Sequence, residues 1–325
     1  MTRILFFFSL IFSVLTLAAC NNEERSSSVA LKSGKVPSSI RIGYQRSSTL
    51  MTLLKESGEL ERELKKYNIK VNWHEFTSGQ PLLEALNVGS IDVTADVADT
   101  VPVFAQAAQA NLTYYAKETA SPHAQAILIP QSSNIKTLQD LKGKKIAVTK
   151  AAGSHYLLIA ALNKAGLKFK DIHAAWLSPA DGRAAFEHNS VDAWVTWEPY
   201  VSSGTVIQKA KILATGDGLA SYTRYYLTTQ SFARKYPEIL KLIIVQLQKK
   251  AEEVKDHPEN TAKILSPLWG DLPQDVVLKA NKNRSYNIQP VVTNDMVEQQ
   301  KIGDAFYNES LIPKPINAKN SDIFQ

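Results

Sequence analysis

Hydrophobic and polar residues follow two periods along the chain from residue 40 onward. Alternation at every second position predicts strands at 40–44, 69–76, 91–97, 126–130, 145–149, 173–177 and 191–196. Apolar residues spaced three and four apart predict helices at 49–66, 81–88, 100–110, 137–141 and 155–165. This alternation of strands and helices predicts mainly parallel sheets covered by helices.

The pattern restarts near residue 137, which indicates a second α/β unit within the same chain. Ser178-Pro179-Ala180-Asp181 has the residue types of a helix start, with a serine cap and a proline at the first position. One more strand is predicted from Tyr225, and helices follow from Ser231 to the end. The longest of them is predicted over 237–255.

The N-terminus has the pattern of a secretory signal. Arg3 precedes an almost wholly apolar run over 4–17, and Leu17-Ala18-Ala19-Cys20 has the spacing of a bacterial lipobox. We therefore predict a signal peptide over 1–19, lipidation of Cys20, and a lipid-anchored polar tether over 20–39. The expected location is the periplasm or the cell surface, anchored to a bacterial membrane. The alternative is a transmembrane anchor, but the run is shorter than the roughly 20 residues that a spanning helix needs.

Composition excludes several classes of function. The formal net charge is +6, or +5 once Arg3 is removed, and the basic residues are dispersed, so we expect no nucleic-acid partner. The only cysteine is Cys20, which excludes intrachain disulfides and thiolate sites in the mature domain. The six histidines have no metal-ligand spacing, and no serine lies in a G-x-S-x-G turn. We expect no metal, no cofactor and no enzymatic activity; an enzyme on the same fold is the remote alternative.

Several segments resemble the aliphatic sulfonate-binding proteins of bacterial ABC importers, within the taurine, nitrate and sulfonate receptor group. They are Gly43-Tyr44-Gln45, the run 83–92, the run 102–108, the run 138–144, Ala165-Gly166-Leu167, Val191-Asp192-Ala193-Trp194 and Trp197-Glu198-Pro199-Tyr200. The resemblance implies a type II periplasmic-binding-protein fold, in which two α/β lobes joined by two crossover strands close over a ligand cleft.

The same resemblance implies the domain boundaries and the partners. Lobe 1 is expected to comprise 40–126 and 225–325, and lobe 2 is expected to comprise 127–224, with crossovers near 127–131 and 218–226. The implied ligand is a small sulfonate anion, taken up as a sulfur source. The implied partners are an inner-membrane ABC permease and its ATPase, and the receptor is expected to be a monomer. Taurine, nitrate or another small ligand of the group remains the alternative.

A sulfonate stays ionised and offers three acceptor oxygens, so its site needs donors, which helix N-termini supply. Three junctions between a loop and a helix fit this demand: Gln45 with Ser47 and Ser48, Asp99 with Thr100, and Gly153 with Ser154 and His155. The alternative for each is a helix cap without a ligand. The family usually has T-G-D at the second junction, where this chain has Val97-Ala98-Asp99-Thr100, so that contact stays open.

Two residues after a strand of the second unit complete the candidate site. Trp197 is expected to line an apolar wall for the ligand's tail, whereas Trp194 alternates with it and is expected in the core. Glu198 would repel a sulfonate, so it must point aside, pair with a cation or hold a ligand amine. Asp99 raises the same possibility, and an amine would favour a zwitterion such as taurine.

Overall fold

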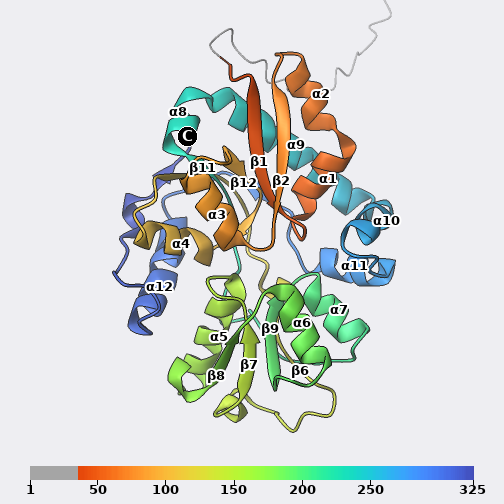
Figure 1. The fold of residues 1–325 in the computed structure, drawn as a ribbon, viewed down its shortest axis with the longest axis vertical. Coiled ribbons are helices and arrows are strands. Elements are labelled where there is room, and N and C mark those ends of the chain that lie inside the picture. The colour runs from red at the N-terminus through yellow and green to blue at the C-terminus, as the bar shows by residue number, and fades with distance from the viewer. Residues whose placement is uncertain (1–35) are drawn as a thin grey trace, which may run out of the picture.

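The computed structural model describes residues 36–325, which form two α/β lobes, one above the other in Figure 1. The predicted signal peptide, Cys20 and most of the predicted tether lie outside the described residues. Within 36–325, no helix has both the length and the apolar character needed to cross a bilayer.

Lobe 1 is built on an eight-stranded sheet, and we use this name for the sheet and the helices around it. The strand order is β12-β5-β11-β3-β1-β2, with β13 paired to β5 and β4 paired to β11. The strands are β1 (Ser39–Gln45), β2 (Lys70–Phe76), β3 (Val93–Thr94), β4 (Val97–Ala98), β5 (Leu112–Glu118), β11 (Arg224–Thr229), β12 (Ile288–Gln289) and β13 (Asp322–Ile323). The helices are α1 (Thr49–Ser57), α2 (Glu59–Lys65), α3 (Gly79–Asn87), α4 (Thr100–Ala107), α8 (Gln230–Lys235), α9 (Pro237–Asp256), α10 (Pro258–Leu268), α11 (Gln274–Lys282) and α12 (Asp295–Asn308), with the 3-10 turn η4 (Ala318–Asn320).

Lobe 2 is built on a five-stranded sheet of order β10-β6-β9-β7-β8. Its strands are β6 (Gln125–Ile129), β7 (Lys145–Val148), β8 (His173–Trp176), β9 (Ala193–Trp197) and β10 (Lys211–Thr215). Its helices are α5 (Gly153–Lys164), α6 (Pro179–Glu187) and α7 (Tyr200–Val206), with 3-10 turns η1 (Pro122–Ala124), η2 (Leu138–Leu141) and η3 (Phe169–Asp171). Trp194 of β9 is buried in this lobe, as predicted.

Both sheets are mixed, which corrects the expectation of mainly parallel sheets. The chain leaves the first sheet through β5 and returns through β11, which lies antiparallel to β5 and β3. It enters the second sheet through β6 and leaves through β10, and these two strands are antiparallel to each other. The pairs β1–β2, β1–β3, β7–β8 and β7–β9 are parallel. Passing twice between the lobes introduces β6 and β11 as antiparallel strands, and β12 is antiparallel to β5 as well.

The links between the lobes differ in position from the predicted crossovers. Because β6 already begins at Gln125, the first link comprises residues 119–124, and the predicted crossover at 127–131 instead falls largely within β6. The second link comprises residues 216–223, close to the predicted 218–226.

Two predicted elements are divided in the structure. The helix predicted over 49–66 is broken at Gly58, whose φ of 63° lies in the left-handed region and ends α1 before α2 begins. The strand predicted over 91–97 consists of β3 and β4, with Ala95 and Asp96 between them. That interruption brings Asp96 to the boundary of the lobes, where it matters for the site.

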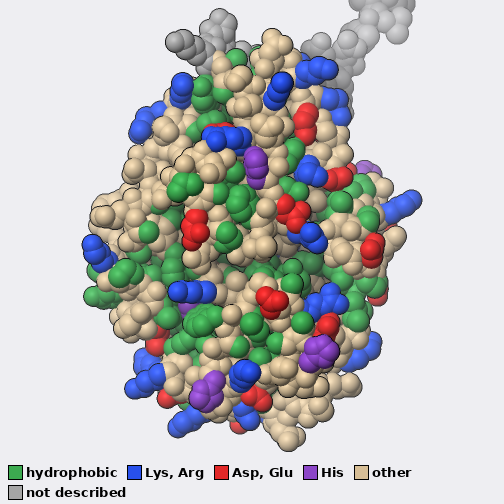
Figure 2. Space-filling view, viewed as in Figure 1, with side chains coloured by type: hydrophobic (Ala, Val, Ile, Leu, Met, Phe, Trp, Pro, Cys, Tyr) green, Lys and Arg blue, Asp and Glu red, His purple; other side chains and the backbone are tan. Residues whose placement is uncertain are grey.

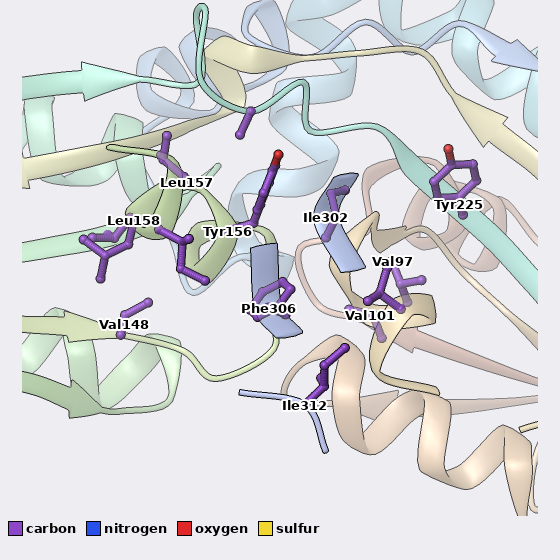
Figure 3. Close-up of a cluster of buried hydrophobic side chains, with 14 of the residues drawn as sticks. Val97, Val101, Val148, Tyr156, Leu157, Leu158, Tyr225, Ile302, Phe306 and Ile312 are labelled. Carbon is purple, nitrogen blue, oxygen red and sulfur yellow. The ribbon is translucent and has the colours of Figure 1, made fainter. Parts of the chain in front are cut away.

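The largest apolar cluster runs through both lobes and includes buried residues of α3, α5, α12 and β7. Figure 3 shows Val97 and Val101 of lobe 1 on one side and Val148, Leu157 and Leu158 of lobe 2 on the other, with Phe306 between them. The rings of Phe306 and Tyr156 are 6.4 Å apart between centroids. The lobes are therefore closed against each other in this structure.

Candidate ligand site between the two lobes

A small cavity lies where the lobes meet. Its walls come from both lobes and from the second link: Gln45, Ser47, Gly79, Asp96, Ala98, Val101, Ala152, Gly153, Trp197, Tyr222, Arg224 and Arg284. Its volume of about 20 Å³ suffices for about one water molecule. A larger ligand therefore requires the lobes to separate before it enters.

Three helices begin at this cavity. Gly79 is the first residue of α3, Gly153 is the first residue of α5, and Val101 is the second residue of α4. The first N–H groups of a helix have no partner within the helix, and the helix dipole makes that end positive. Three such ends around one cavity create an environment that favours an anion.

Arg284 adds a full positive charge to the same place. Its guanidinium is buried and donates to the carbonyl of Ser47 at 2.8 Å, to Oγ1 of Thr49 at 2.9 Å and to the carbonyl of Glu198 at 2.7 Å. None of the ion pairs within residues 36–325 involves Arg284, and its Nε has no hydrogen-bond partner. Burial raises the pKa of Glu198 and of Glu118, and the Arg284 charge opposes both rises. No described carboxylate lies within ion-pair distance of the guanidinium, which is therefore available to an anion.

Arg224 lines the cavity as well, but its charge is already compensated. It donates to Oδ2 of Asp96 at 2.6 Å and to Oε2 of Glu118, and all three residues are buried. Burial raises the pKa of the Glu118 carboxyl, and the Arg224 charge opposes this rise. The other oxygen of Asp96, Oδ1, is buried without a partner. Asp96 therefore offers the cavity one free carboxylate oxygen.

Four of the predicted site residues line the cavity: Gln45, Ser47, Gly153 and Trp197. Gln45 donates through Nε2 to the carbonyl of Asp96 at 3.1 Å, and the indole N–H of Trp197 donates to Oγ of Ser47 at 3.5 Å. The second contact joins the two lobes. Ser48 is buried, does not line the cavity, and precedes α1 without a side-chain cap bond.

Thr100 and Asp99 are engaged with the protein itself in the closed structure. Thr100 donates through Oγ1 to the carbonyl of Ala151 at 2.7 Å, which joins α4 of lobe 1 to lobe 2. Asp99 is buried and accepts from the backbone N–H of Thr223 through Oδ2 at 3.1 Å. Neither residue lines the cavity: Thr100 contributes to closure, whereas Asp99 bonds to the second link beside β11.

Ser154 and His155 follow Gly153 in the first turn of α5, and both are buried. Oγ of Ser154 and Nε2 of His155 have no hydrogen-bond partner. The imidazole lies among aromatic rings of both lobes, 4.8 Å from Phe306 and 5.0 Å from Trp176 between centroids. Burial lowers the pKa of His155 to about 3, so the ring is neutral.

Glu198 points aside, one of the possibilities that the sequence left open. Its carboxylate accepts from the N–H of Ser202 at 3.0 Å and the hydroxyl of Ser202 at 2.9 Å, within the first turn of α7. It also accepts from Nδ2 of Asn283 at 2.6 Å, a further contact between the lobes. Glu198 does not line the cavity, and its carboxylate locks lobe 2 to the segment that carries Arg284.

Sequence reasoning missed the charged residues of the cavity. Arg224 and Arg284 belong to no recognisable motif, and Arg284 lies 235 positions after Thr49, to which it donates. Only the fold brings them together. Within residues 36–325, no group of three or more His, Cys, Asp or Glu side chains is arranged to hold a metal ion.

Asp99 provides a prediction on pH dependence. Burial, with a smaller effect of the Glu298 charge, raises its pKa from 3.8 to about 7. A carboxyl whose pKa is higher in the folded state favours folding most below pH 4, and this contribution is lost as the pH rises through about 7. Asp99→Asn should therefore raise the melting temperature by several degrees at pH 8 and by little at pH 4.

Thermal melting at both pH values tests this expectation. The exposed Asp271→Asn variant, at a left-handed position that Asp and Asn both tolerate, is the control and should show no such difference between the two pH values. An Asp99→Asn variant whose gain is equal at pH 4 and pH 8 would show that Asp99 does not titrate in this way.

The two lobes and the cavity between them are those of the type II periplasmic-binding-protein class. A family model described as NMT1/THI5 like matches residues 64–261. The chain is 37% identical to an aliphatic sulfonates-binding protein of Escherichia coli (strain K12), over 90% of this chain and 91% of that protein. It is 32% identical to the protein of the same description from Bacillus subtilis (strain 168), over 86% of this chain and 84% of that protein.

Solved structures agree with this result. The alkanesulfonate-binding protein SsuA from Xanthomonas axonopodis pv. citri, bound to MOPS, superposes with a TM-score of 0.81 at 36% identity, covering 87% of this chain and 97% of that one. The periplasmic aliphatic sulphonate binding protein SsuA of E. coli gives the same TM-score at 37% identity, covering 89% and 93% of the two chains. The chain belongs to the NMT1/THI5-like family and, within it, to the group of these sulfonate-binding proteins. The resemblance seen in the sequence and the expected fold class are confirmed, and these relatives are binding proteins, not enzymes.

Proposed function

We propose that this chain is the receptor of a bacterial ABC importer, which captures an aliphatic sulfonate outside the cytoplasm and delivers it to the permease and its ATPase. The observation that carries the proposal is the buried Arg284 guanidinium, without an ion-pair partner in the described chain, beside a cavity at which three helices begin. A sulfonate is ionised at every physiological pH and has three acceptor oxygens for these donors. The names of the relatives support the same ligand class.

The proposal includes the anchor and the physiological role predicted from the sequence. Cys20 would carry the lipid that holds the receptor at the membrane, and the captured sulfonate would serve as a sulfur source. Mass spectrometry of the membrane-extracted chain tests the first point. A mature chain that begins at another residue, or that carries no lipid on Cys20, would contradict it.

Isothermal titration calorimetry with ethanesulfonate, taurine and nitrate tests the ligand. Ethanesulfonate should bind and nitrate should bind much more weakly, because closure around a small ion leaves the apolar part of the cleft unfilled. Absence of heat with ethanesulfonate would contradict the proposal.

One observation favours a zwitterionic sulfonate such as taurine as a second candidate. Asp96 lines the cavity, and its buried Oδ1 has no partner, so it could accept a hydrogen bond from a ligand ammonium group. Asn at this position could still accept from Arg224 but would carry no charge. If taurine is the ligand, Asp96→Asn should weaken taurine binding and spare ethanesulfonate; equal effects on both would remove this candidate.

Gly153 provides a prediction about closure. A Cβ atom at this position would lie 2.4 Å from Cε2 and 2.6 Å from Cδ2 of Tyr222, closer than real contacts allow. Gly153→Ala should therefore keep the lobes slightly apart and lower the affinity for ethanesulfonate about tenfold, as expected for overpacking of roughly 1–3 kcal/mol. Calorimetry measures the loss, and small-angle X-ray scattering with ligand should show a larger radius of gyration than in wild type. Unchanged affinity would show that Tyr222 yields without cost.

A further inference from the structure

An apolar groove of about 320 Å³ lies beside the cavity, also between the two lobes. Lobe 1 contributes α3, α4 and the segment Leu311–Pro313, and lobe 2 contributes Lys150 and Ala151. On the face drawn in Figure 2, hydrophobic side chains gather along the boundary between the lobes. The volume is within the roughly 300–1,000 Å³ of small-molecule sites.

Each of the two helices presents one face to the groove. The lining residues of α3 are Gln80, Leu83, Glu84 and Asn87, and those on α4 and at its end include Val101, Phe104, Ala105 and Ala108. Both sets follow the spacing i, i+3, i+4, i+7, which places them on one side of a helix. The α4 side is apolar and, with Leu311, Ile312 and Pro313, forms a surface suited to hydrocarbon. The small side chains of the alanines leave space in the groove.

The groove and the cavity are adjacent. Val101 lines both. Ala151 lines the groove, whereas the next two residues, Ala152 and Gly153, line the cavity. The hydrogen bond from Thr100 to the carbonyl of Ala151 crosses the same boundary. Because one wall of each space belongs to lobe 1 and another to lobe 2, separating the lobes joins the two spaces into one cleft.

The charged residues indicate which end of a ligand lies in the cavity and which end lies in the groove. The buried Arg284 guanidinium lies in the cavity and not in the groove, whose charged residues Glu84 and Lys150 are exposed at its surface. An anionic headgroup is therefore stabilised in the cavity, and only the apolar remainder gains from the groove.

We propose that the groove receives the hydrocarbon tail of the ligand, so that the receptor prefers sulfonates with long alkyl or aryl tails over short ones. This inference rests on the proposed function, since it places the headgroup beside Arg284. It also assigns the tail to α4 and Leu311–Pro313, whereas the sequence pointed to Trp197 for that role. Trp197 instead contacts Ser47 across the cavity.

The test compares ethanesulfonate with octanesulfonate by calorimetry on the purified chain. Each buried methylene contributes about fourfold, so burial of about three to four of the extra methylenes of octanesulfonate should make wild type bind it about 100-fold more tightly than ethanesulfonate. Ala108→Trp places an indole in the groove at an exposed position and should weaken octanesulfonate binding on the order of tenfold, with ethanesulfonate within about twofold of wild type. Ala184→Trp, at an exposed alanine of α6 that lines neither space, is the matched control and should change neither affinity.

A second variant tests the groove by gain instead of loss. Asn87→Leu replaces an exposed polar lining residue of α3 with an apolar one and should tighten octanesulfonate binding severalfold without affecting ethanesulfonate. Equal affinities of wild type for the two sulfonates, or parallel changes for both in Ala108→Trp and Asn87→Leu, would overturn the groove proposal while leaving sulfonate binding intact. Absence of binding to either sulfonate in wild type would overturn the proposed function and this inference with it.

Discussion

Replacing Arg284 by glutamine should reduce the affinity for ethanesulfonate about 100-fold. Hydrogen bonds to a charged group contribute roughly 1.5–3 kcal/mol, and each 1.4 kcal/mol is a factor of ten in affinity. Arg284 has no ion-pair partner among the described residues, so its charge is available to the ligand. The side-chain amide of glutamine can still form hydrogen bonds with Ser47 and Thr49, but it carries no charge. Calorimetry measures the change.

The stability of the ligand-free variant separates a binding role from a structural one. Loss of a buried, unpaired charge offsets part of the lost hydrogen bonds, so the melting temperature without ligand should change by only a few degrees. Arg234→Gln, at an exposed position of α8, is the matched control and should bind normally. An Arg284→Gln variant with wild-type affinity would remove the observation on which the proposed function rests.

Replacing Arg224 by methionine should destabilise the fold by about 3–5 kcal/mol, the usual cost of removing one partner from a buried ion pair. Asp96 and Glu118 would remain as two buried carboxylates without their counter-ion. Thermal or denaturant unfolding measures the loss, which should amount to roughly 10 °C or more in melting temperature.

An exposed ion pair provides the control for this variant. Lys241→Met removes the pair with Glu238, which lies at the surface and should contribute only about 0–1 kcal/mol. Burial raises the pKa of Glu118 and the Arg224 charge opposes this rise, so in Arg224→Met the Glu118 carboxylate should take up a proton as the pH falls, and part of the lost stability should return at lower pH. A variant as stable as Lys241→Met at neutral pH would show that the three buried residues are not coupled.

The sequence predicted the α/β class and most of the helices and strands, because local periodicity specifies such elements. It did not predict β5 and β10, or that the sheets are mixed, because strand direction depends on where the chain passes between lobes. The glycine at position 58 carried a signal for the break between α1 and α2, but an amphipathic pattern on both sides concealed it.

For the candidate site, the sequence indicated the turns that line the cavity, but it did not indicate the charged side chains there. Gln45, Ser47, Gly153 and Trp197 lie at ends of strands or at a helix start, where an α/β fold places ligands, and all four line the cavity. Arg284 lies in a loop after α11 and has no such signal. Its position depends on long-range packing that one sequence does not reveal.

The contacts of Arg284 have a kinetic consequence. One guanidinium donates to the carbonyl of Ser47 on lobe 1 and to the carbonyl of Glu198 on lobe 2, and the neighbouring Asn283 donates to the Glu198 carboxylate. If an anion binds beside Arg284 as proposed, its escape would break bonds between protein groups as well as bonds to the anion. Residence time would then be set by the rate at which residues 283–284 release lobe 2, and a transporter that pulls on this segment could discharge the cargo without competing for it.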